Sequence, residues 1–501
     1  MQPVPGYGRA VMPPAGPTPR AQFLHVFPSI MLPMFLAVVD QTIVATALPA
    51  IAASLGEVER VSWVVTAYLI AITLAAPVYG RLGDAFGRRR LMLAALAIFM
   101  TASLLCALAP SIELLTAARV LQGLGGGGLM TLSQALIGET IPPRERGRYQ
   151  GYLAAVVVSS STFGPVAGGY LTQHLGWPSI FLVNIPIGVL AGLLVLRLAP
   201  RPGGPGNFRF DFLGLVLFVL FVGPLLLALE QAQRWETQAL PGILALIACG
   251  LVALVLLLRH EARTPSPLLP LSLLRQPAIW RSDALAACHG AALVSLVTFL
   301  PIYLQVVRGV SAAASGLLLL PLTIFVGIGS MITGQIVSRT GRTTIFPSYG
   351  LIVVTLGLVF LALYAPQLSV PQLPLVFAWN ALFMGTVMGV VQVTVQSVAG
   401  PAMLGAAAAS VQFSRSVGAA FGTAAVATVL FATLATGDRE TASLFAVLVE
   451  RGPEAMAALP PARQAAVQAE IAAAFRAAFL TMAGFAAAGL ALAWSIPVRR
   501  I

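Results

Sequence analysis

The sequence contains no lysine and little charge of any kind, since charged residues make up 9% of its 501 residues. Hydrophobic residues make up 58%, and the mean hydropathy is +0.91. A chain this apolar has too little polar surface to coat a soluble fold. The composition therefore predicts a protein whose main solvent is lipid.

Cysteine and histidine are also scarce, and their positions exclude several kinds of site. They are scattered without CxxC spacing, and the cysteines fall in apolar stretches: Cys106, Cys249, Cys288, His25, His174, His260 and His289. This spacing is not that of a zinc site or of a Cys/His nucleophile. We therefore expect no metal, no cofactor, no catalytic residue and no enzymatic activity.

Acidic residues are fewer than basic ones, and the formal net charge is +12. All 29 basic residues are arginines, and they cluster in the breaks between apolar stretches rather than along one helix face. A nucleic-acid binder needs a polar domain that presents a basic surface, and the sequence offers none. We therefore expect no nucleic-acid partner.

Apolar stretches about 20 residues long recur along the chain, which is the length of a helix that crosses a bilayer core about 30 Å thick. The period-two alternation of a β-barrel is absent. We expect an all-α integral membrane protein with about 14 transmembrane helices, near 24–50, 62–79, 91–109, 113–135, 149–171, 179–198, 212–230, 240–258, 282–305, 312–337, 344–364, 372–396, 404–435 and 472–496. The Pro-rich residues 1–22 are expected to form a flexible cytoplasmic tail, followed by a retained first helix rather than a signal peptide.

The arginines favour one orientation. With a cytoplasmic N-terminus, the inner segments hold most of them: Arg81, Arg88, Arg89, Arg90, Arg144, Arg146, Arg148, Arg201, Arg209, Arg259, Arg263, Arg275, Arg339, Arg342, Arg499 and Arg500. This asymmetry predicts that both termini are cytoplasmic. The only long outer loop spans 436–471, and we expect its amphipathic run from Ala455 to Arg476 to lie on the membrane surface or to cap the exit, with a plain packing role left open.

An internal repeat divides the chain. The segment from Gly80 to Arg90 resembles the segment from Gly334 to Arg342, and one offset aligns five pairs of glycines: Gly80 with Gly334, Gly87 with Gly341, Gly151 with Gly405, Gly164 with Gly418 and Gly168 with Gly422. The pattern indicates two related six-helix halves that rock around a midplane site. We expect a first bundle at 23–198, two inserted helices within 199–276 and a second bundle at 277–501.

Four motifs carry a resemblance to a known family. They are the first-span run from Leu36 to Pro49, the loop from Gly80 to Arg90, the fourth-span run from Arg119 to Gly123 and the fifth-span run from Gly164 to Gly169. With these motifs in this order, the chain resembles the major facilitator superfamily, and within it the fourteen-helix EmrB/QacA-type drug:proton antiporters. The resemblance covers essentially all of the chain after the tail, and it implies the major facilitator fold.

Asp40 and Arg119 are the candidate proton-coupling residues. Asp40 lies near the middle of the first span, where an ionised carboxylate is costly and burial favours the protonated form. Arg119 lies at a similar depth in span four, and the resemblance associates this arginine with proton coupling. Two plain readings stay open: an Asp40 bonded to Gln41 or Thr42 for packing, and a fixed ion pair with Arg119 that only specifies packing.

The loop after span two is a candidate gate. Its glycines, Gly80, Gly83 and Gly87, permit a tight turn. The resemblance implies that Asp84 and basic partners such as Arg88 form a latch that stabilises the outward-open state, whereas Arg89 and Arg90 are better explained as topology signals.

The fifth-span run combines the helix breaker Pro165 with the small residues Gly164, Gly168 and Gly169, which allow helices to approach closely. The resembled family carries its antiporter motif here, which favours export. The run from Gly123 to Gly128 lacks the lysine and the preceding strand of a phosphate loop, so we expect a close-packing helix face instead.

We expect the substrate cavity to be lined by spans one, four, five, nine, twelve and thirteen. The expected lining is apolar and amide-rich: Met34, Gln41, Phe163, Gln305, Asn380 and Gln392. Arg415, a second charge within the membrane, is expected either to face this cavity or to bond to backbone carbonyls. Asp40 is taken as the one membrane acid, which suggests neutral or singly charged cargo.

No ATP-binding motif is present, so the energy source is expected to be an ion gradient. The resemblance implies a proton-coupled antiporter in the bacterial cytoplasmic membrane, acting in multidrug efflux and antibiotic resistance. The alternative is an exporter of a specific lipid, siderophore or metabolite on the same fold. The expected partners are small-molecule cargo, protons and the lipid bilayer, and a periplasmic adaptor protein is left open.

Overall fold

The computed structural model describes residues 19–56, 60–199, 209–233, 240–436, 441, 444–445, 448 and 460–500. Within these ranges the side chains of 19–25, 232–233, 312–313 and 461–462 are not described. Nearly all of the expected tail, Arg201, and most of 437–459 within the expected loop 436–471 lie outside the described residues. The described chain is built from long helices.

The first half is formed by the helices that precede the inserted pair: α1 (Pro19–Leu55), α2 (Trp63–Phe86), α3 (Arg88–Ala107), α4 (Ile112–Thr140), α5 (Pro143–Leu175), α6 (Ser179–Leu182) and α7 (Asn184–Leu196). The inserted pair is α8 (Phe212–Gln233) and α9 (Leu240–Glu261). The second half comprises α10 (Leu271–Leu274), α11 (Pro277–Ile302) with the π-helical turn η3 (Tyr303–Val307), α12 (Ala312–Thr340), α13 (Ile345–Tyr364), η4 (Val370–Gln372), α14 (Leu373–Ala399), η5 (Pro401–Met403), α15 (Leu404–Thr436) and α18 (Pro461–Ser495).

Thirteen helical segments of the described chain are long and apolar enough to cross a membrane. The helix α4 is not among them, although it has 29 residues and packs against α1, α2 and α3. The five glycines of its run from Gly123 to Gly128 explain this close packing, because a Cβ on any of them would collide with atoms of α2 or α3. With α4, the described helices match the expected fourteen spans.

Apolar side chains form separate cores in the two halves. Two buried clusters fill the first half, and one larger cluster fills the second. The inserted pair has a small core of its own around Phe218 and Leu257, and this core continues onto Ile70 of α2 and Phe413 of α15. The inserted helix α8 is therefore docked over the line where the two halves meet.

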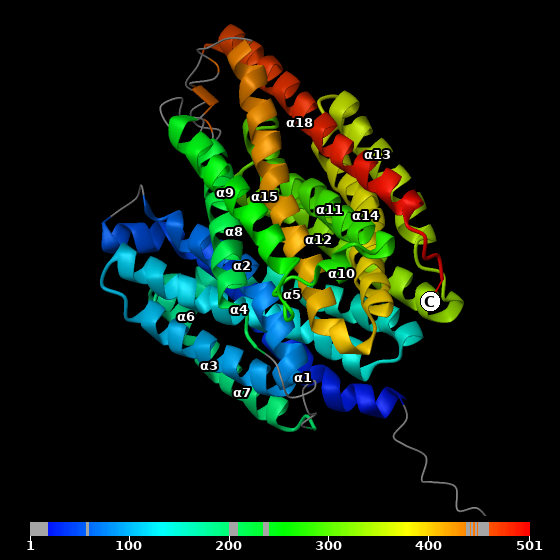
Figure 1. Ribbon diagram of the computed structural model, residues 1–501. Helices are drawn as coiled ribbons and strands as arrows, with labels where there is room; N and C mark the ends of the chain where they lie inside the picture. The colour runs from blue at the N-terminus through cyan, green and yellow to red at the C-terminus, as the bar shows by residue number, and fades with distance from the viewer. Residues whose placement is uncertain are drawn as a thin grey trace, which may run out of the picture.

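Figure 1 shows the first half at the lower left and the second half at the upper right, with α8 and α9 beside their junction. The start of α1 and the C-terminus lie toward the same end of the molecule (Figure 1). We call this the basic end, because Arg88, Arg342, Arg499 and Arg500 lie there at the ends of helices. The halves meet along α2 with α15 and along α5 with α12.

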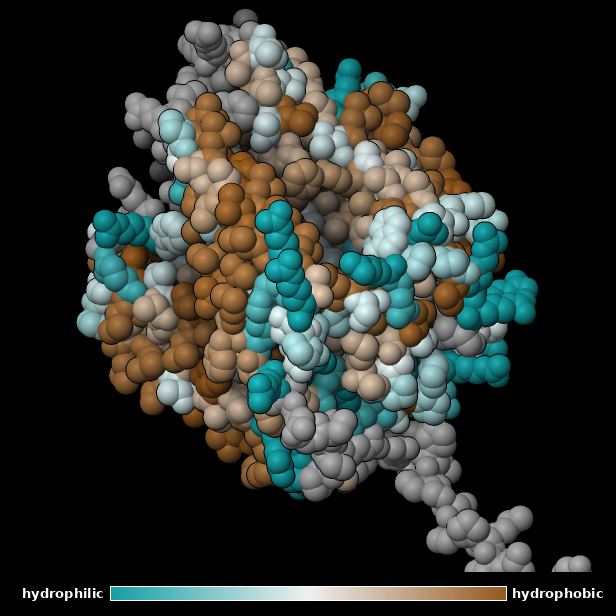
Figure 2. Space-filling view, viewed as in Figure 1, coloured by the Kyte–Doolittle hydropathy of each residue, from teal (hydrophilic) through white to brown (hydrophobic). Residues whose placement is uncertain are grey.

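The outer surface is apolar over the helix faces. Figure 2 shows hydrophobic residues over α8, α9 and the lower-left bundle. Leu251 and Val252 of α9 and Leu193 of α7 are more than half exposed. Such a surface fits acyl chains rather than water, as the sequence predicted.

Glycines make the tight turn expected after span two. Only Gly87 separates α2 from α3, and its φ of 89° lies in the region that favours glycine. At the matching position of the second half, Gly341 ends α12 with a φ of 66°. The repeat is thus visible in the backbone as well as in the sequence.

Of the roles expected for the run from Ala455 to Arg476, the described part supports the packing role and not the membrane-surface one. Residues 461–476 do not form a separate surface helix, because α18 runs without a break from Pro461 to Ser495. Its early apolar positions Val467, Ile471 and Phe475 are buried in the core of the second half. Their spacing, which suggested a membrane-surface face, instead marks the side of a long span that packs against the bundle.

Candidate functional site

Asp40 lies inside the first half, at the centre of a hydrogen-bonded network. Its side chain has no exposed area. Arg119 Nη1 donates to Asp40 Oδ2 at 2.5 Å, and the other carboxylate oxygen accepts from Gln122 Nε2 at 2.8 Å and from Asn184 Nδ2 at 2.7 Å. The carboxylate is therefore held by side chains from α4 and α7, and not by Gln41 or Thr42.

The guanidinium of Arg119 is equally enclosed. Its Nε donates to the carbonyl of Val64 at 3.0 Å, and its Cζ lies 3.9 Å from the centre of the Tyr68 ring. The Tyr68 hydroxyl in turn donates to the carbonyl of Ala37 at 3.0 Å. Tyr68 of α2 thus stacks on the guanidinium of the ion pair and also donates a hydrogen bond to α1, one turn before Asp40.

A third layer joins the network to α3. Ser103 Oγ accepts from Gln122 Nε2 at 2.7 Å and from Asn184 Nδ2 at 3.0 Å. These three residues were missed from the sequence. A signal was present for Gln122 and Asn184, because an amide side chain within an apolar span needs a hydrogen-bond partner. Gln122 also lies one turn after Arg119.

At the basic end, Asp84 binds the second half. Its two carboxylate oxygens accept from the backbone N–H of Gly405 at 2.8 Å and of Ala406 at 3.0 Å, at the start of α15. Arg88 makes ion pairs with both Asp84 and Glu139. Because a helix N-terminus carries partial positive charge, α15 is a favourable partner for this carboxylate.

Close glycine contacts accompany this interaction. A Cβ on Gly405 would lie 2.2 Å from the carbonyl oxygen of Gly80, and a Cβ on Gly334 would lie 2.0 Å from that of Gly147. The backbones of the two halves therefore touch at the basic end in two places that the repeat relates, between α2 and α15 and between α5 and α12. In this structure the basic end is closed.

The second half has no equivalent of Asp84. The matching residue is Ser338, whose hydroxyl donates to the Gln335 carbonyl of its own helix at 2.8 Å. Among the described residues, the charged contact across the halves at these two positions is therefore made from one side alone.

The expected antiporter motif packs against α1. A Cβ on Gly164 would lie 1.9 Å from Thr42 Oγ1, and one on Gly168 would lie 2.3 Å from Thr46 Oγ1. Gly169, by contrast, has open space around it. Pro165 lies inside α5, which continues through it. Two of the three glycines therefore set the distance between α5 and the helix that carries Asp40.

A cavity of about 370 Å³ lies where the halves and the inserted pair meet. Helices α1, α2, α4, α8, α11 and α15 line it with apolar side chains and with polar ones, among them Gln41, Thr73, Glu230, Gln412, Arg415 and Ser416. Arg415 Nη2 donates to Gln412 Oε1 at 3.2 Å. The cavity thus combines an apolar wall with a few polar groups, as small-molecule sites do.

The structure places only Gln41 and Arg415 of the expected cavity residues in this lining. Met34 is 4% exposed in the core of the first half, and Asn380 is fully buried, with its Nδ2 3.4 Å from the Val354 carbonyl. For these two the expected lining is wrong in this conformation. They face into their own bundles, where Met34 packs among apolar side chains and the Asn380 amide donates to a backbone carbonyl.

The remaining expected residues also lie outside the lining of this cavity. Phe163 is exposed beside Phe35, Gln305 is within reach of the Ser315 hydroxyl, and Gln392 is buried. The expected spans five and twelve, which are the helices α5 and α14, are absent from the lining. The helices α2 and α8 line the cavity instead. The docking of the inserted pair against α2 and α15 accounts for the part played by α8.

The view of Asp40 as the one membrane acid is also wrong. Asp283 of α11 is 5% exposed, and its Oδ1 accepts a hydrogen bond from Ser410 at 3.3 Å. Glu230 of α8 lines the cavity. Both lie near the ends of expected spans, where an acid is easily taken for a loop residue. The inference about cargo charge from a single acid therefore does not stand.

Comparison with known proteins gives a consistent result. The sequence model of the Major Facilitator Superfamily matches residues 30–423. "Uncharacterized MFS-type transporter Rv1877" of Mycobacterium tuberculosis is 34% identical over 80% of this chain and 58% of its own length. "Multidrug transporter protein MdtP" of Bacillus subtilis is 32% identical over 78% of this chain and 72% of its own length. The chain therefore spans less than two thirds of the mycobacterial relative.

Solved structures share the fold. The human organic anion transporter MFSD10 superposes with a TM-score of 0.65 at 16% identity, over 95% of this chain and 100% of that one. The proton:xylose symporter XylE superposes with a TM-score of 0.64 at 14% identity, over 95% of this chain and 96% of that one. At these identities the likeness concerns the fold alone.

Proposed function

The chain belongs to the major facilitator superfamily, a family of membrane transporters and not of enzymes, and on that premise we propose that it is a proton-coupled antiporter. Its cargo is amphipathic or hydrophobic small molecules, which it exports across the bacterial cytoplasmic membrane by alternating access. The basic end faces the cytoplasm, following the rule that arginines stay inside. The driving force is the proton gradient.

The observation that carries this proposal is the buried pair of Asp40 and Arg119. An ion pair without solvent contact is costly, and an ionisable residue within a span is by default a candidate functional group. Protonation of Asp40 removes its charge and so weakens its attraction to Arg119, whose other contacts to Val64 and Gln122 hold it in place. One proton therefore changes how firmly α1 is bound to α4 and α7.

The helix α1 links this pair to the cargo. Asp40 faces the interior of the first half, and the next residue, Gln41, lines the cavity. A shift of α1 on protonation therefore moves the cavity wall, and bound cargo opposes or favours that shift. This coupling needs no direct contact between proton and cargo, only a different cargo affinity in the two states.

The cavity chemistry supports drug-like cargo. Its wall mixes apolar side chains with amides, hydroxyls and the charges of Glu230 and Arg415. Such a lining accepts many shapes and gives little selectivity among them. One similar protein is named a multidrug transporter. An exporter of one lipid, siderophore or metabolite is the alternative, and a narrow cargo range would favour it.

The gate completes the cycle. While the contact between Asp84 of α2 and the start of α15 closes the basic end, the cavity is shielded from the cytoplasm. Loading requires this contact to break and the glycine pairs to separate, so that the halves rock apart at the basic end. Asp84 thus acts as a latch for the state in which cargo is released outside.

The test is transport by inside-out vesicles with an imposed proton gradient. A panel of toxic dyes first identifies one that the parent protein moves. Asp40→Asn should abolish its gradient-driven movement, while Asp283→Asn, which removes a different buried carboxylate that lies outside the Arg119 network, should retain it. Protein amounts in the membrane are matched. Full transport by Asp40→Asn, or equal loss in both variants, would overturn the assignment.

A further inference from the structure

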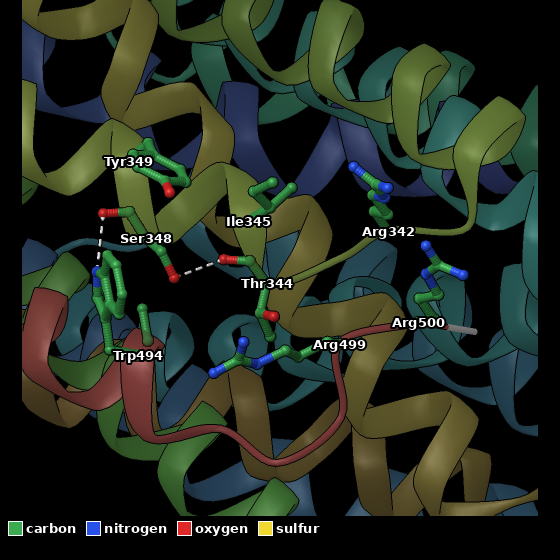
Figure 3. A pocket seen from close by; sticks show the side chains of 9 residues that line it. Arg342, Thr344, Ile345, Ser348, Tyr349, Trp494, Arg499 and Arg500 are labelled. Carbon is green, nitrogen blue, oxygen red and sulfur yellow. Dashed lines mark hydrogen bonds between the residues drawn. The ribbon is translucent and has the colours of Figure 1, made fainter.

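A second pocket, at the basic end, is built from the second half alone. It has a volume of about 280 Å³ and lies between the start of α13 and the end of α18. Figure 3 shows Arg342 and Arg500 on one side of it, Arg499 below and the rings of Tyr349 and Trp494 on the other side. This pocket is separate from the cavity described above.

The backbone holds the arginines together. The C-terminal tail pairs with the turn before α13, because Arg342 and Arg500 form an antiparallel bridge and Thr343 N donates to the Arg499 carbonyl at 3.1 Å. Three guanidinium groups thereby line one space. No acidic residue is among the described residues that line it.

The repeat shows that Arg342 has lost partners that its counterpart keeps. The separation of Gly80 from Gly334 also relates Arg88 to Arg342. Arg88 is bound by Asp84 and Glu139, and the same offset places Ser338 and Val393 at those positions. At these matched positions the second half thus keeps the cation but not the acids, so among the described residues Arg342 lacks the pair of partners that holds Arg88.

The residues around the pocket are of the kinds that collect at a membrane surface. Tyr349 and Trp494 are both more than half exposed, their rings are 5.9 Å apart, and Trp494 Nε1 is 3.4 Å from the Ser348 carbonyl. Tyrosine and tryptophan collect at the level of lipid headgroups, and clustered arginines on the cytoplasmic side attract anionic lipid.

An exposed apolar stripe continues from the pocket along α13. Tyr349, Leu356 and Phe360 share one face of the helix, and Leu356 is 63% exposed. This stripe leads from the arginines into the span. A free phosphate ion would use the arginines but not the stripe, whereas a phospholipid uses both.

We propose that this pocket, the arginine pocket, binds the phosphodiester headgroup of an anionic membrane phospholipid, with an acyl chain along α13. Arginine forms paired hydrogen bonds to phosphate oxygens. A volume of about 280 Å³ holds a phosphate and its attached alcohol. The site is a binding site for lipid at the edge of the second half and does not depend on the transport cycle.

The first test measures lipid retained by the purified full chain with native mass spectrometry. The probes are phosphatidylglycerol and phosphatidylcholine, titrated separately. The triple variant Arg342→Gln, Arg499→Gln and Arg500→Gln should bind phosphatidylglycerol about 100-fold more weakly, since each basic residue contributes roughly fivefold. The control triple Arg144→Gln, Arg263→Gln and Arg275→Gln removes the same charge from exposed positions at the basic end and should bind like the parent.

The second test needs no arginine variant. Phosphatidylglycerol with brominated acyl chains should quench the fluorescence of Trp494, measured as the difference between the parent and Trp494→Phe, and brominated phosphatidylcholine should not. Millimolar inorganic phosphate should not reverse the quenching. Equal loss in both triples, equal quenching by the two lipids, or reversal by phosphate would overturn the proposal, the last result by identifying a free-anion site.

Discussion

The latch at the basic end permits a quantitative prediction. Asp84→Asn leaves one neutral acceptor where a carboxylate now binds the N–H groups of Gly405 and Ala406. Hydrogen bonds to a charged group contribute about 1.5–3 kcal/mol each, and neutral ones about 0.5–1.5 kcal/mol. The closed state should therefore lose at least about 1.5 kcal/mol relative to the open one, which lowers the closed-to-open ratio by about 10-fold or more.

Cysteine accessibility measures this shift. Val337 of α12 is 1% exposed and packs against Gly147, so a cysteine there is protected while the basic end is closed. In a background with the native cysteines replaced, Val337→Cys should react faster with a membrane-impermeant maleimide applied from the cytoplasmic side when Asp84→Asn is present. Ser338→Ala is the control, because that hydroxyl bonds within its own helix. Parental reactivity and full transport in Asp84→Asn would refute the latch.

Two further predictions concern the motif on α5 and the cavity. Gly164→Ala should lower the unfolding temperature in detergent, because overpacking costs about 1–3 kcal/mol and the new Cβ would lie 1.9 Å from Thr42 Oγ1. Gly169→Ala is the control and should leave the unfolding temperature unchanged, because Gly169 has open space around it. Equal effects of the two substitutions would contradict a packing role for the motif. Arg415→Gln should favour cationic over anionic dyes in export competition, because it removes a positive charge from the cavity lining and leaves the acid Glu230 there. An unchanged preference would show that cargo does not approach this arginine.

The fold was largely predictable, because lipid imposes a simple rule on sequence. Each span needs an apolar run of about 20 residues, and arginines mark the loops on one side. The turn at Gly87 and the two-half repeat followed from glycine spacing. The beginning of the last helix did not, because an amphipathic run such as that around Val467 fits either a membrane surface or a bundle face.

The site was predictable only in part. Asp40 and Arg119 stood out as charges within spans, and the structure places them in contact. Asn184, by contrast, comes from a helix distant in sequence, and no local pattern connects it to Asp40. The orientation of Met34 and Asn380 was not accessible either, since a span that is apolar on all sides does not reveal which face meets a cavity.

The inserted pair presented a different difficulty. Hydropathy identified α8 and α9 as spans, but it carried no information about where they dock. The contact of Phe218 with Phe413 places α8 against α15, and this brings Glu230 into the cavity wall. The sequence alone therefore predicted the helices of the insert but not its part in the candidate cargo site.

The central claim is that cargo binding is coupled to the release of a proton from Asp40, and proton release on cargo binding tests it most directly. The purified parent protein, in weakly buffered detergent solution with a pH indicator, should release protons when a transported dye is added. Asp40→Asn should bind the dye and release none. Dye binding with the same proton release in Asp40→Asn as in the parent would contradict the account.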